Sequence, residues 1–254
     1  MKLANLSAVV TGGASGLGLA SARALCARGV AVVIADSSDE NGMRAAADLG
    51  PKARYVRADV RDTPQMTAAF DAAVALAPLR VLIHCAGINR PVRPVEKDGE
   101  PGSLAEFETI VNINLIGTFN CLRLAAARMA KNEPAEGDRG VCVLTASIAA
   151  YEGQIGQIGY SATKAGIVGM TLVAARDLAK RQIRICSIAP GIFDTPLLAR
   201  LPDDIRGALA ASVPHPARLG APDEFAQLAL HIVENSMLNG ETIRLDGALR
   251  MAPR

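Results

Sequence analysis

The chain has 254 residues, of which 50% are hydrophobic and 20% charged, and its formal net charge is +2 at pH 7. This length and apolar content support a sizeable core, and we expect a single domain spanning residues 1–254. Because the lysines and arginines are scattered, we expect a small-molecule partner and no nucleic-acid or membrane partner. The sequence shows no secretion-signal pattern and no uninterrupted apolar stretch of about 18 residues, so a cytoplasmic protein is expected.

The sequence also gives little sign of disulfides or metal ligands. The five cysteines are isolated and mostly lie within apolar runs, so we expect buried, reduced thiols. The three histidines, His84, His215 and His231, are far apart and lack the spacing of metal ligands. We therefore expect no metal site.

A glycine-rich turn follows the first predicted strand, residues 7–10, and precedes a helical segment at 19–28. In a strand–turn–helix unit of this kind, Gly12 permits a tight turn, Gly16 lets the backbone approach a pyrophosphate, and Gly18 lets the helix pack closely on the strand. The phosphates then lie at the positive end of the helix. The turn predicts a dinucleotide site with contacts from Gly12, Ser15, Gly16, Leu17 and Gly18.

The second predicted strand, residues 30–35, ends in Asp36, which follows Gly18 by 18 residues and so lies near the distance of about 20 expected for a ribose-binding carboxylate. A carboxylate accepts hydrogen bonds from ribose hydroxyls and repels a 2′-phosphate. Since Ser15, Ser37 and Ser38 supply no compensating cation, we expect the cofactor to be NAD rather than NADP. The alternative is that Asp36 only caps the next helix.

The alternation of strands and helices continues to the end of the chain. It predicts an α/β fold, a doubly wound Rossmann domain with a mostly parallel seven-stranded sheet and helices on both faces. Further strands are expected at 53–58, 80–85, 139–147, 183–189 and 241–246, and further helices at 39–49, 63–76, 104–131, 157–181 and 223–234. Strand ends are expected to meet the cofactor through Asp59, Val60, Cys85, Ala86 and Gly87.

Tyr160 and Lys164 are four residues apart and therefore share one face of the predicted helix. A tyrosine hydroxyl has a pKa of about 10, and a nearby ammonium favours its ionised form, which makes it usable for proton transfer. Ser147, at the end of an apolar strand, faces the same helix. The three side chains are predicted to converge on one carbonyl oxygen, although a single Tyr-x-x-x-Lys pattern also arises by chance.

Two loops and one helix complete the expected site. Residues 89–103 form a surface excursion beside a strand end, where ligands bind in open α/β sheets. Residues 192–215 are apolar but irregular and predict a lid over a bound ligand. The helix at 104–131 is apolar on nearly every side, which predicts burial against the sheet and a second subunit. It carries Asn112, Asn114 and Asn120, among which position alone does not choose.

The order of these motifs resembles the short-chain dehydrogenase/reductase family over the whole chain. The resemblance implies Ser147, Tyr160 and Lys164 as catalytic residues, with Asn114, in Asn-Leu-Ile-Gly, holding a water on the proton path. It implies that Lys164 lowers the pKa of Tyr160 and binds the nicotinamide ribose, and that the apolar helices form the interface of a homotetramer. It also implies cofactor contacts from Tyr160, Lys164, Pro190, Gly191, Phe193 and Thr195. The family's usual Asn-Ala-Gly reads Cys85-Ala86-Gly87 here, which removes one amide from the cofactor site.

Segments 145–154, 189–198 and 238–248 are more specifically similar to the type 2 3-hydroxyacyl-CoA dehydrogenases of this family, which use NAD and also accept steroids. The implied substrate is a short or branched 3-hydroxyacyl-CoA. A lid rich in apolar side chains fits this class, and it includes Ile192, Phe193, Leu197, Leu198, Leu201 and Leu209.

Residues outside the catalytic group are expected to hold the ester. Gln154 is a candidate for the thioester carbonyl, and Arg90, Arg93 and Lys97 either meet the CoA phosphates or are merely solvated. The alternatives are a hydroxysteroid or other secondary-alcohol dehydrogenase and a 3-oxoacyl-carrier-protein reductase. An NAD-binding regulatory or scaffold protein is a rival of a different class.

Overall fold

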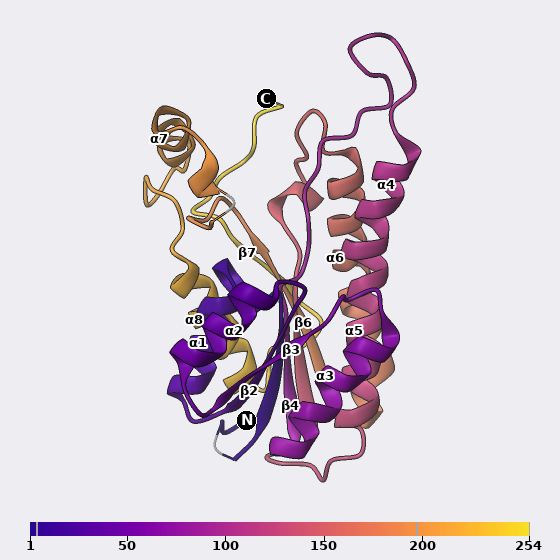
Figure 1. Ribbon diagram of the computed structural model, residues 1–254, viewed down its shortest axis with the longest axis vertical. Helices are drawn as coiled ribbons and strands as arrows, with labels where there is room; N and C mark the ends of the chain where they lie inside the picture. Colours follow the sequence, from indigo (N-terminus) through magenta and orange to yellow (C-terminus); the bar gives the residue numbers. More distant parts are fainter. Residues whose placement is uncertain (4, 197, 254) are drawn as a thin grey trace.

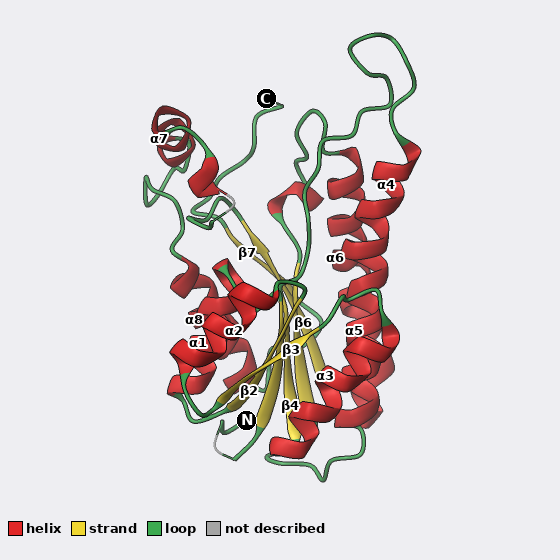
Figure 2. Cartoon of the chain, viewed as in Figure 1, coloured by secondary structure: helices red, strands yellow, loops and turns green. Residues whose placement is uncertain are grey.

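The computed structural model describes residues 1–3, 5–196 and 198–253, and its centre is a sheet of seven strands (Figures 1 and 2). The strand order is β3-β2-β1-β4-β5-β6-β7, and every neighbouring pair is parallel. The predicted fold class is confirmed, with a sheet that is parallel throughout rather than mostly so. The strands are β1 Ser7–Thr11, β2 Ala31–Asp36, β3 Ala53–Arg57, β4 Leu79–His84, β5 Gly140–Thr145, β6 Ile183–Pro190 and β7 Thr242–Leu245.

Helices cover both faces of the sheet, as the red ribbons in Figure 2 show. The α-helices are α1 Gly16–Ala27, α2 Asp39–Leu49, α3 Thr63–Leu76, α4 Leu104–Val111, α5 Gly117–Met129, α6 Ile158–Leu178, α7 Asp203–Ala211 and α8 Pro222–Glu234. Short helical turns occur at η1 Asn112–Ile116, η2 Ile148–Ala150, η3 Ala179–Arg181 and η4 Leu198–Arg200.

The apolar strands supply two cores, one on each face of the sheet. Val10 and Ile34 pack with α1, α2 and α8, whereas their neighbours Val9 and Val33 pack with α3, α5 and α6. Successive side chains of a strand point to opposite faces, so a strand covered on both sides is apolar at nearly every position. This explains why the central strands are continuous apolar runs without alternating polar residues.

Strand β1 lies between β2 and β4, so the chain reverses its direction of winding at this point. In an open parallel sheet, the loops at the carboxyl ends of the strands diverge at such a reversal and leave a crevice there. The glycine-rich turn follows β1, and Asp36 ends β2. The topology therefore brings the predicted nucleotide-binding residues to one edge of the sheet.

The segment at 192–215 is more regular than the sequence suggested. It contains η4 and the helix α7, where we expected an irregular lid. Asp203 and Asp204 occupy the first turn of α7, where carboxylates interact favourably with the helix dipole, and alanines follow. The prolines on both sides of this short helix led us to expect an irregular segment. Leu197 lies outside the described residues.

The two long apolar helical segments, Leu104–Met129 and Ile158–Arg181, have the length and composition of membrane spans, with 56% and 33% of the tested windows buried. Their buried residues pack against the sheet. The apolar side chains Ile116, Phe119, Leu172 and Val173 remain exposed on the same helices. These segments are thus core helices that also present an apolar outer face.

Candidate cofactor site and active site

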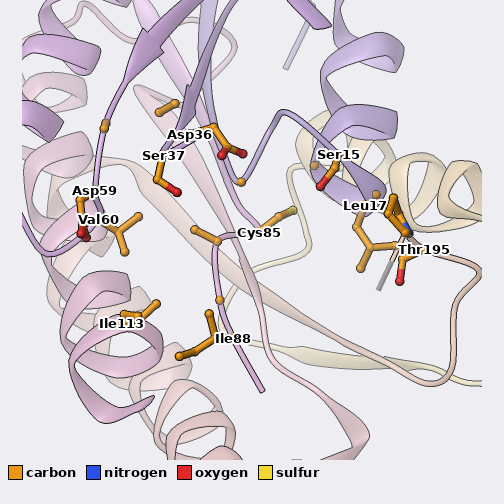
Figure 3. A pocket seen from close by; sticks show the side chains of 18 of the residues that line it. Ser15, Leu17, Asp36, Ser37, Asp59, Val60, Cys85, Ile88, Ile113 and Thr195 are labelled. Atoms are coloured by element: carbon orange, nitrogen blue, oxygen red, sulfur yellow. The ribbon is translucent and has the colours of Figure 1, made fainter. Parts of the chain in front are cut away.

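A cavity of about 590 Å³ opens at the carboxyl ends of β1 to β4 (Figure 3). Figure 3 shows Ser15, Leu17 and Thr195 on one side and Asp59, Val60 and Ile113 on the other. The cavity brings together the predicted residues Gly12, Ser15, Gly16, Leu17, Gly18, Asp36, Asp59, Val60, Cys85, Ala86, Gly87 and Thr195. Ile88 and Ile113 were not predicted, although each adjoins a predicted residue and both line the same cavity.

Two glycines make the close approach of the turn to the neighbouring strand possible. Gly12 has a φ of +62°, and a Cβ atom there would lie 2.8 Å from the backbone nitrogen of Ala86. A Cβ atom on Gly18 would collide with the carbonyl oxygen of Gly12. Any side chain at these two positions would push the turn away from the sheet and from the start of α1. The space for a dinucleotide therefore depends on the absence of these atoms.

Both carboxylate oxygens of Asp36 accept backbone hydrogen bonds, from the nitrogen of Ala14 at 3.1 Å and from the nitrogen of Ser38 at 3.0 Å. The side chain is thereby oriented at the cavity wall. Arg61 also lines the cavity, but its guanidinium binds Asp59, with 2.6 Å between Nη2 and Oδ2. In this structure the cation is therefore paired with Asp59 and not with Asp36.

A second cavity of about 370 Å³ contains Ser147, Tyr160 and Lys164. It shares Leu17, Cys85, Gly87, Ile88 and Thr195 with the first cavity, so the two adjoin at the end of β4. The predicted residues Gln154, Pro190, Gly191 and Phe193 line it as well. A cofactor in the first cavity and a substrate in the second would therefore meet beside the three catalytic candidates.

Lys164 is 4% exposed, and its Nζ atom donates a hydrogen bond to the carbonyl oxygen of Thr145 at 2.7 Å. Its ammonium lies 5.6 Å from the centre of the Tyr160 ring, as the spacing along α6 predicted. Burial lowers the pKa of Lys164 to about 8, so the side chain remains mostly charged at neutral pH.

The pKa of Tyr160 is raised, chiefly because burial disfavours the phenolate, while a hydrogen bond with Ser147 opposes this rise. The expected lowering of this pKa is thus not produced by the protein groups alone. Ser147 accepts a hydrogen bond from the nitrogen of Ala149 at 3.1 Å, so its single hydroxyl hydrogen points away from Ala149 and serves the Tyr160 oxygen.

Asn114 is fully buried in the π-helical turn η1, which interrupts the helix predicted at 104–131. Its amide accepts a hydrogen bond from the nitrogen of Ile88 and donates one to the carbonyl oxygen of Ile88, each at 2.8 Å. Asn112 is exposed, and Asn120 donates to the carbonyl oxygen of Val60. Asn114 lines neither cavity, but of the three asparagines it is the one bonded to Ile88, which lines both. Extra residues in a helical turn often mark functional sites.

His84, at the end of β4, connects the glycine-rich turn with the Asn114 turn. Its Nδ1 atom lies 2.8 Å from Thr11 Oγ1, and its Nε2 atom lies 2.9 Å from Thr118 Oγ1. The Thr118 hydroxyl donates its single hydrogen to the carbonyl oxygen of Asn114, so His84 must donate from Nε2 and accept at Nδ1 from Thr11. The neutral imidazole satisfies every partner, and a second ring proton would face a hydroxyl donor.

Burial accordingly lowers the pKa of His84 from 6.5 to about 3, with a smaller contribution from the Lys164 charge. Because the unfolded chain binds this proton and the folded chain does not, the free energy of unfolding should fall by up to about 1.4 kcal/mol per pH unit below pH 6.5. In His84→Asn, the free energy of unfolding should no longer show this part of its dependence on pH. Urea denaturation of both proteins at pH 5, 6 and 7 measures it, and curves with identical pH dependence would contradict the expectation.

Four further residues were predicted to hold the ester, and the structure gives their surroundings. Gln154 lines the second cavity, but its Nε2 atom donates to the carbonyl oxygen of Ala252 at 3.2 Å. Arg90 forms an ion pair with Glu106 at 2.9 Å. Arg93 lines a separate surface cavity, and Lys97 is exposed. None of these three cations lines the cavity that contains Tyr160.

Comparisons with known proteins agree with this geometry. A model of the short chain dehydrogenase family matches residues 7–206. The chain is 49% identical over 251 residues to 3-hydroxyacyl-CoA dehydrogenase type-2 of Bos taurus, and the alignment covers 98% of this chain and 96% of the relative. It is 48% identical over 252 residues to the Drosophila melanogaster protein of that name, with 98% and 99% covered.

The crystal structure of 3-hydroxyacyl-CoA dehydrogenase type-2 from Mycobacterium avium superposes with a TM-score of 0.96 at 45% identity, with 98% of each chain covered. The resemblance inferred from the sequence motifs is thereby confirmed. The chain belongs to the short-chain dehydrogenase family and is an oxidoreductase that acts on a small molecule with a nicotinamide cofactor.

Proposed function

We propose that the chain transfers a hydride between NAD and the 3-hydroxyl carbon of a short or branched 3-hydroxyacyl-CoA. The observation that carries this proposal is the meeting of two cavities, one over the glycine-rich turn and one containing Ser147, Tyr160 and Lys164. The names of the relatives at 45–49% identity support the acyl-CoA class.

The chemistry of the protein side chains follows from their contacts. The Tyr160 hydroxyl is the group that takes the proton of the substrate alcohol, or returns it in the reverse direction. When substrate is bound, the Ser147 hydroxyl hydrogen turns from the Tyr160 oxygen to the substrate oxygen and holds that oxygen beside Tyr160. Lys164 supplies a buried positive charge on the same helix face and a donor for the ribose. The nicotinamide, when bound, accepts or gives up the hydride.

Asn114 and Gly87 set the shape of the junction between the cavities. The side-chain amide of Asn114 is hydrogen-bonded to both the N–H and the carbonyl group of Ile88. A Cβ atom at Gly87 would lie 3.1 Å from Asn114 Oδ1 and 3.7 Å from Lys164 Nζ. The amide of Asn114 therefore positions the strand end against which a nicotinamide ring would lie. The main-chain carbonyl of Asn114 accepts a hydrogen bond from the Thr118 hydroxyl and is the group proposed to hold the water.

The preference for NAD rests on Asp36. Its carboxylate is oriented at the cavity wall by two backbone donors, and Arg61, the cation among the lining residues, is paired with Asp59. A 2′-phosphate would bring a second negative charge against Asp36 without a free counter-charge. Ribose hydroxyls, in contrast, would donate hydrogen bonds to the same oxygens.

The lining of the second cavity supports an uncharged acyl chain. Its apolar side chains include Ile148, Ile192, Phe193, Leu198 and Leu209, and Lys164 is the charged residue among those that line it. A free carboxylate among these apolar side chains would lose its hydration, and none of them offers a cation or a hydrogen-bond donor in exchange. The CoA phosphates would remain outside the chamber. Arg93 and Lys97 lie in the surface excursion at 89–103 and would be available to them there.

Steady-state assays with purified protein test the proposal. We expect acetoacetyl-CoA and 2-methyl-3-hydroxybutyryl-CoA to have at least tenfold higher kcat/KM than an acyl-carrier-protein ester or a 17β-hydroxysteroid, and NAD(H) to be preferred over NADP(H). A tenfold preference for the steroid or the carrier-protein ester would replace the CoA assignment. Tight NAD binding without turnover of any alcohol would favour a regulatory role, and a preference for NADP would remove the role given to Asp36.

We also propose a homotetramer built on the outer faces of α5 and α6. Phe119, Leu122, Ala126 and Leu178 line an apolar surface cavity of about 570 Å³ between these helices. An exposed apolar patch of this kind usually marks an interaction site. Light scattering at micromolar concentration tests the assembly, and a stable monomer would contradict it.

A further inference from the structure

The last described residues of the chain lie against the substrate cavity. In Figure 1 the C-terminal end rises between α7 and the loop that leads into α6. Met251 lines the same cavity as Ser147 and Tyr160. Leu249 is 4% exposed and packs with Ile148, and Met251 packs against this small cluster. The described segment 249–253 therefore packs against the chamber, and Met251 is part of its lining.

Two hydrogen bonds fasten this segment to the loop between Ser147 and Tyr160. The nitrogen of Ile155 donates to the carbonyl oxygen of Pro253 at 3.0 Å, and Gln154 Nε2 donates to the carbonyl oxygen of Ala252 at 3.2 Å. Gln154 itself lines the cavity. The segment at 249–253 thus contributes Met251 to the chamber lining and is attached to Gln154, a predicted substrate contact.

Arg244, within β7, connects the C-terminal segment to the loop between Ser147 and Tyr160 through ion pairs and hydrogen bonds. Its guanidinium donates to the two carboxylate oxygens of Glu152 at 2.8 and 2.9 Å, to Asp246 at 2.7 Å, and to the carbonyl oxygen of Leu249 at 3.0 Å. The guanidinium carbon also lies 5.1 Å from the centre of the Tyr151 ring. Bidentate pairs between arginine and a carboxylate are short and directional, so they fix both partners.

From these contacts we propose that the C-terminal segment 249–253 is a wall of the substrate chamber and that Met251 determines the length of acyl chain accepted. The inference rests on the proposed function for the identity of the substrate. Met251 is the side chain of this segment that reaches the cavity, and its backbone is held by neighbours on both sides. A methionine side chain is unbranched and fills irregular space, so shortening it lengthens the chamber without altering Ser147, Tyr160 or Lys164.

The test compares 3-oxoacyl-CoA substrates with chains of four, six and eight carbons, assayed with NADH. For Met251→Ala we expect the ratio of kcat/KM for the eight-carbon substrate to that for the four-carbon substrate to rise by at least about tenfold, a shift that a few methylene groups in a hydrophobic pocket can produce. Met251→Phe should lower the same ratio. Met237→Ala is the matched control, because Met237 is 91% exposed and does not line the cavity.

A ratio within twofold of wild type in folded Met251→Ala and Met251→Phe proteins would overturn the assignment of Met251. Thermal unfolding and NAD titration establish that each variant is folded, and Met251→Val replaces the alanine variant if that protein does not fold. If the wild type turns over no CoA ester, the proposed function fails separately. The same ratio is then measured with 2-butanol, 2-hexanol and 2-octanol, and an unchanged ratio there also overturns the role of Met251.

Discussion

Tyr160→Phe is expected to lower kcat for alcohol oxidation by about 10²- to 10⁴-fold, the usual contribution of a positioned proton-transfer group. The substitution removes the hydroxyl but keeps the ring that packs near Lys164. Cofactor affinity should change by no more than about threefold, because the glycine-rich turn and Asp36 are untouched. NADH absorbance measures turnover, and a fluorescence titration measures the dissociation constant for NAD.

Tyr151→Phe is the matched control for this substitution. Tyr151 is 48% exposed, does not line the chamber, and meets Arg244 through its ring, which phenylalanine preserves. We expect its turnover to stay within about twofold of wild type. If Tyr160→Phe retained turnover within a few fold, Tyr160 would not be the proton-transfer group and another donor at the cavity would have to be sought.

The parts of the site that local sequence could predict are those set by short-range geometry. Gly12 and Gly18 are required by contacts within one strand–turn–helix unit, and Asp36 is placed by the end of the next strand. Tyr160 and Lys164 share a face because one helix carries both. The parallel sheet follows from the βα alternation, since parallel neighbours require crossover helices, whereas the strand order comes from the structure.

Other features depend on contacts between distant segments. The π-helical turn around Asn114 has no local signature, because the asparagine is stabilised there by Ile88 from another loop. Met251 reaches the chamber only because Arg244 and the loop at 151–157 hold the end of the chain. The choice of Asn114 came from family resemblance, and no pattern in the sequence indicated that Met251 lines the substrate chamber. The pairing of Arg90 with Glu106 is likewise a tertiary contact that a count of charges cannot reveal.

Lys164→Met is expected to lower kcat/KM for alcohol oxidation by about 10²- to 10³-fold without loss of stability. The ammonium lies 5.6 Å from the centre of the Tyr160 ring, and a positive charge at this distance favours the phenolate, so its removal is expected to make Tyr160 harder to ionise. The pH of half-maximal oxidation should therefore move upward by about one unit or more. Cofactor affinity should also fall, since a donor proposed to bind the ribose is lost.

The stability of Lys164→Met distinguishes loss of chemistry from loss of folding. Burial holds the pKa of Lys164 at about 8, below its ordinary value of 10.5, so the folded state disfavours the charged lysine at every pH below 8. An apolar side chain of similar length removes this penalty, and we expect a Tm equal to or above that of the wild type. Lys180→Met, on an exposed turn, serves as the control with unchanged turnover. A large fall in Tm would contradict the stability expectation, and a pH profile identical to that of the wild type would contradict a role for the Lys164 charge in tuning Tyr160.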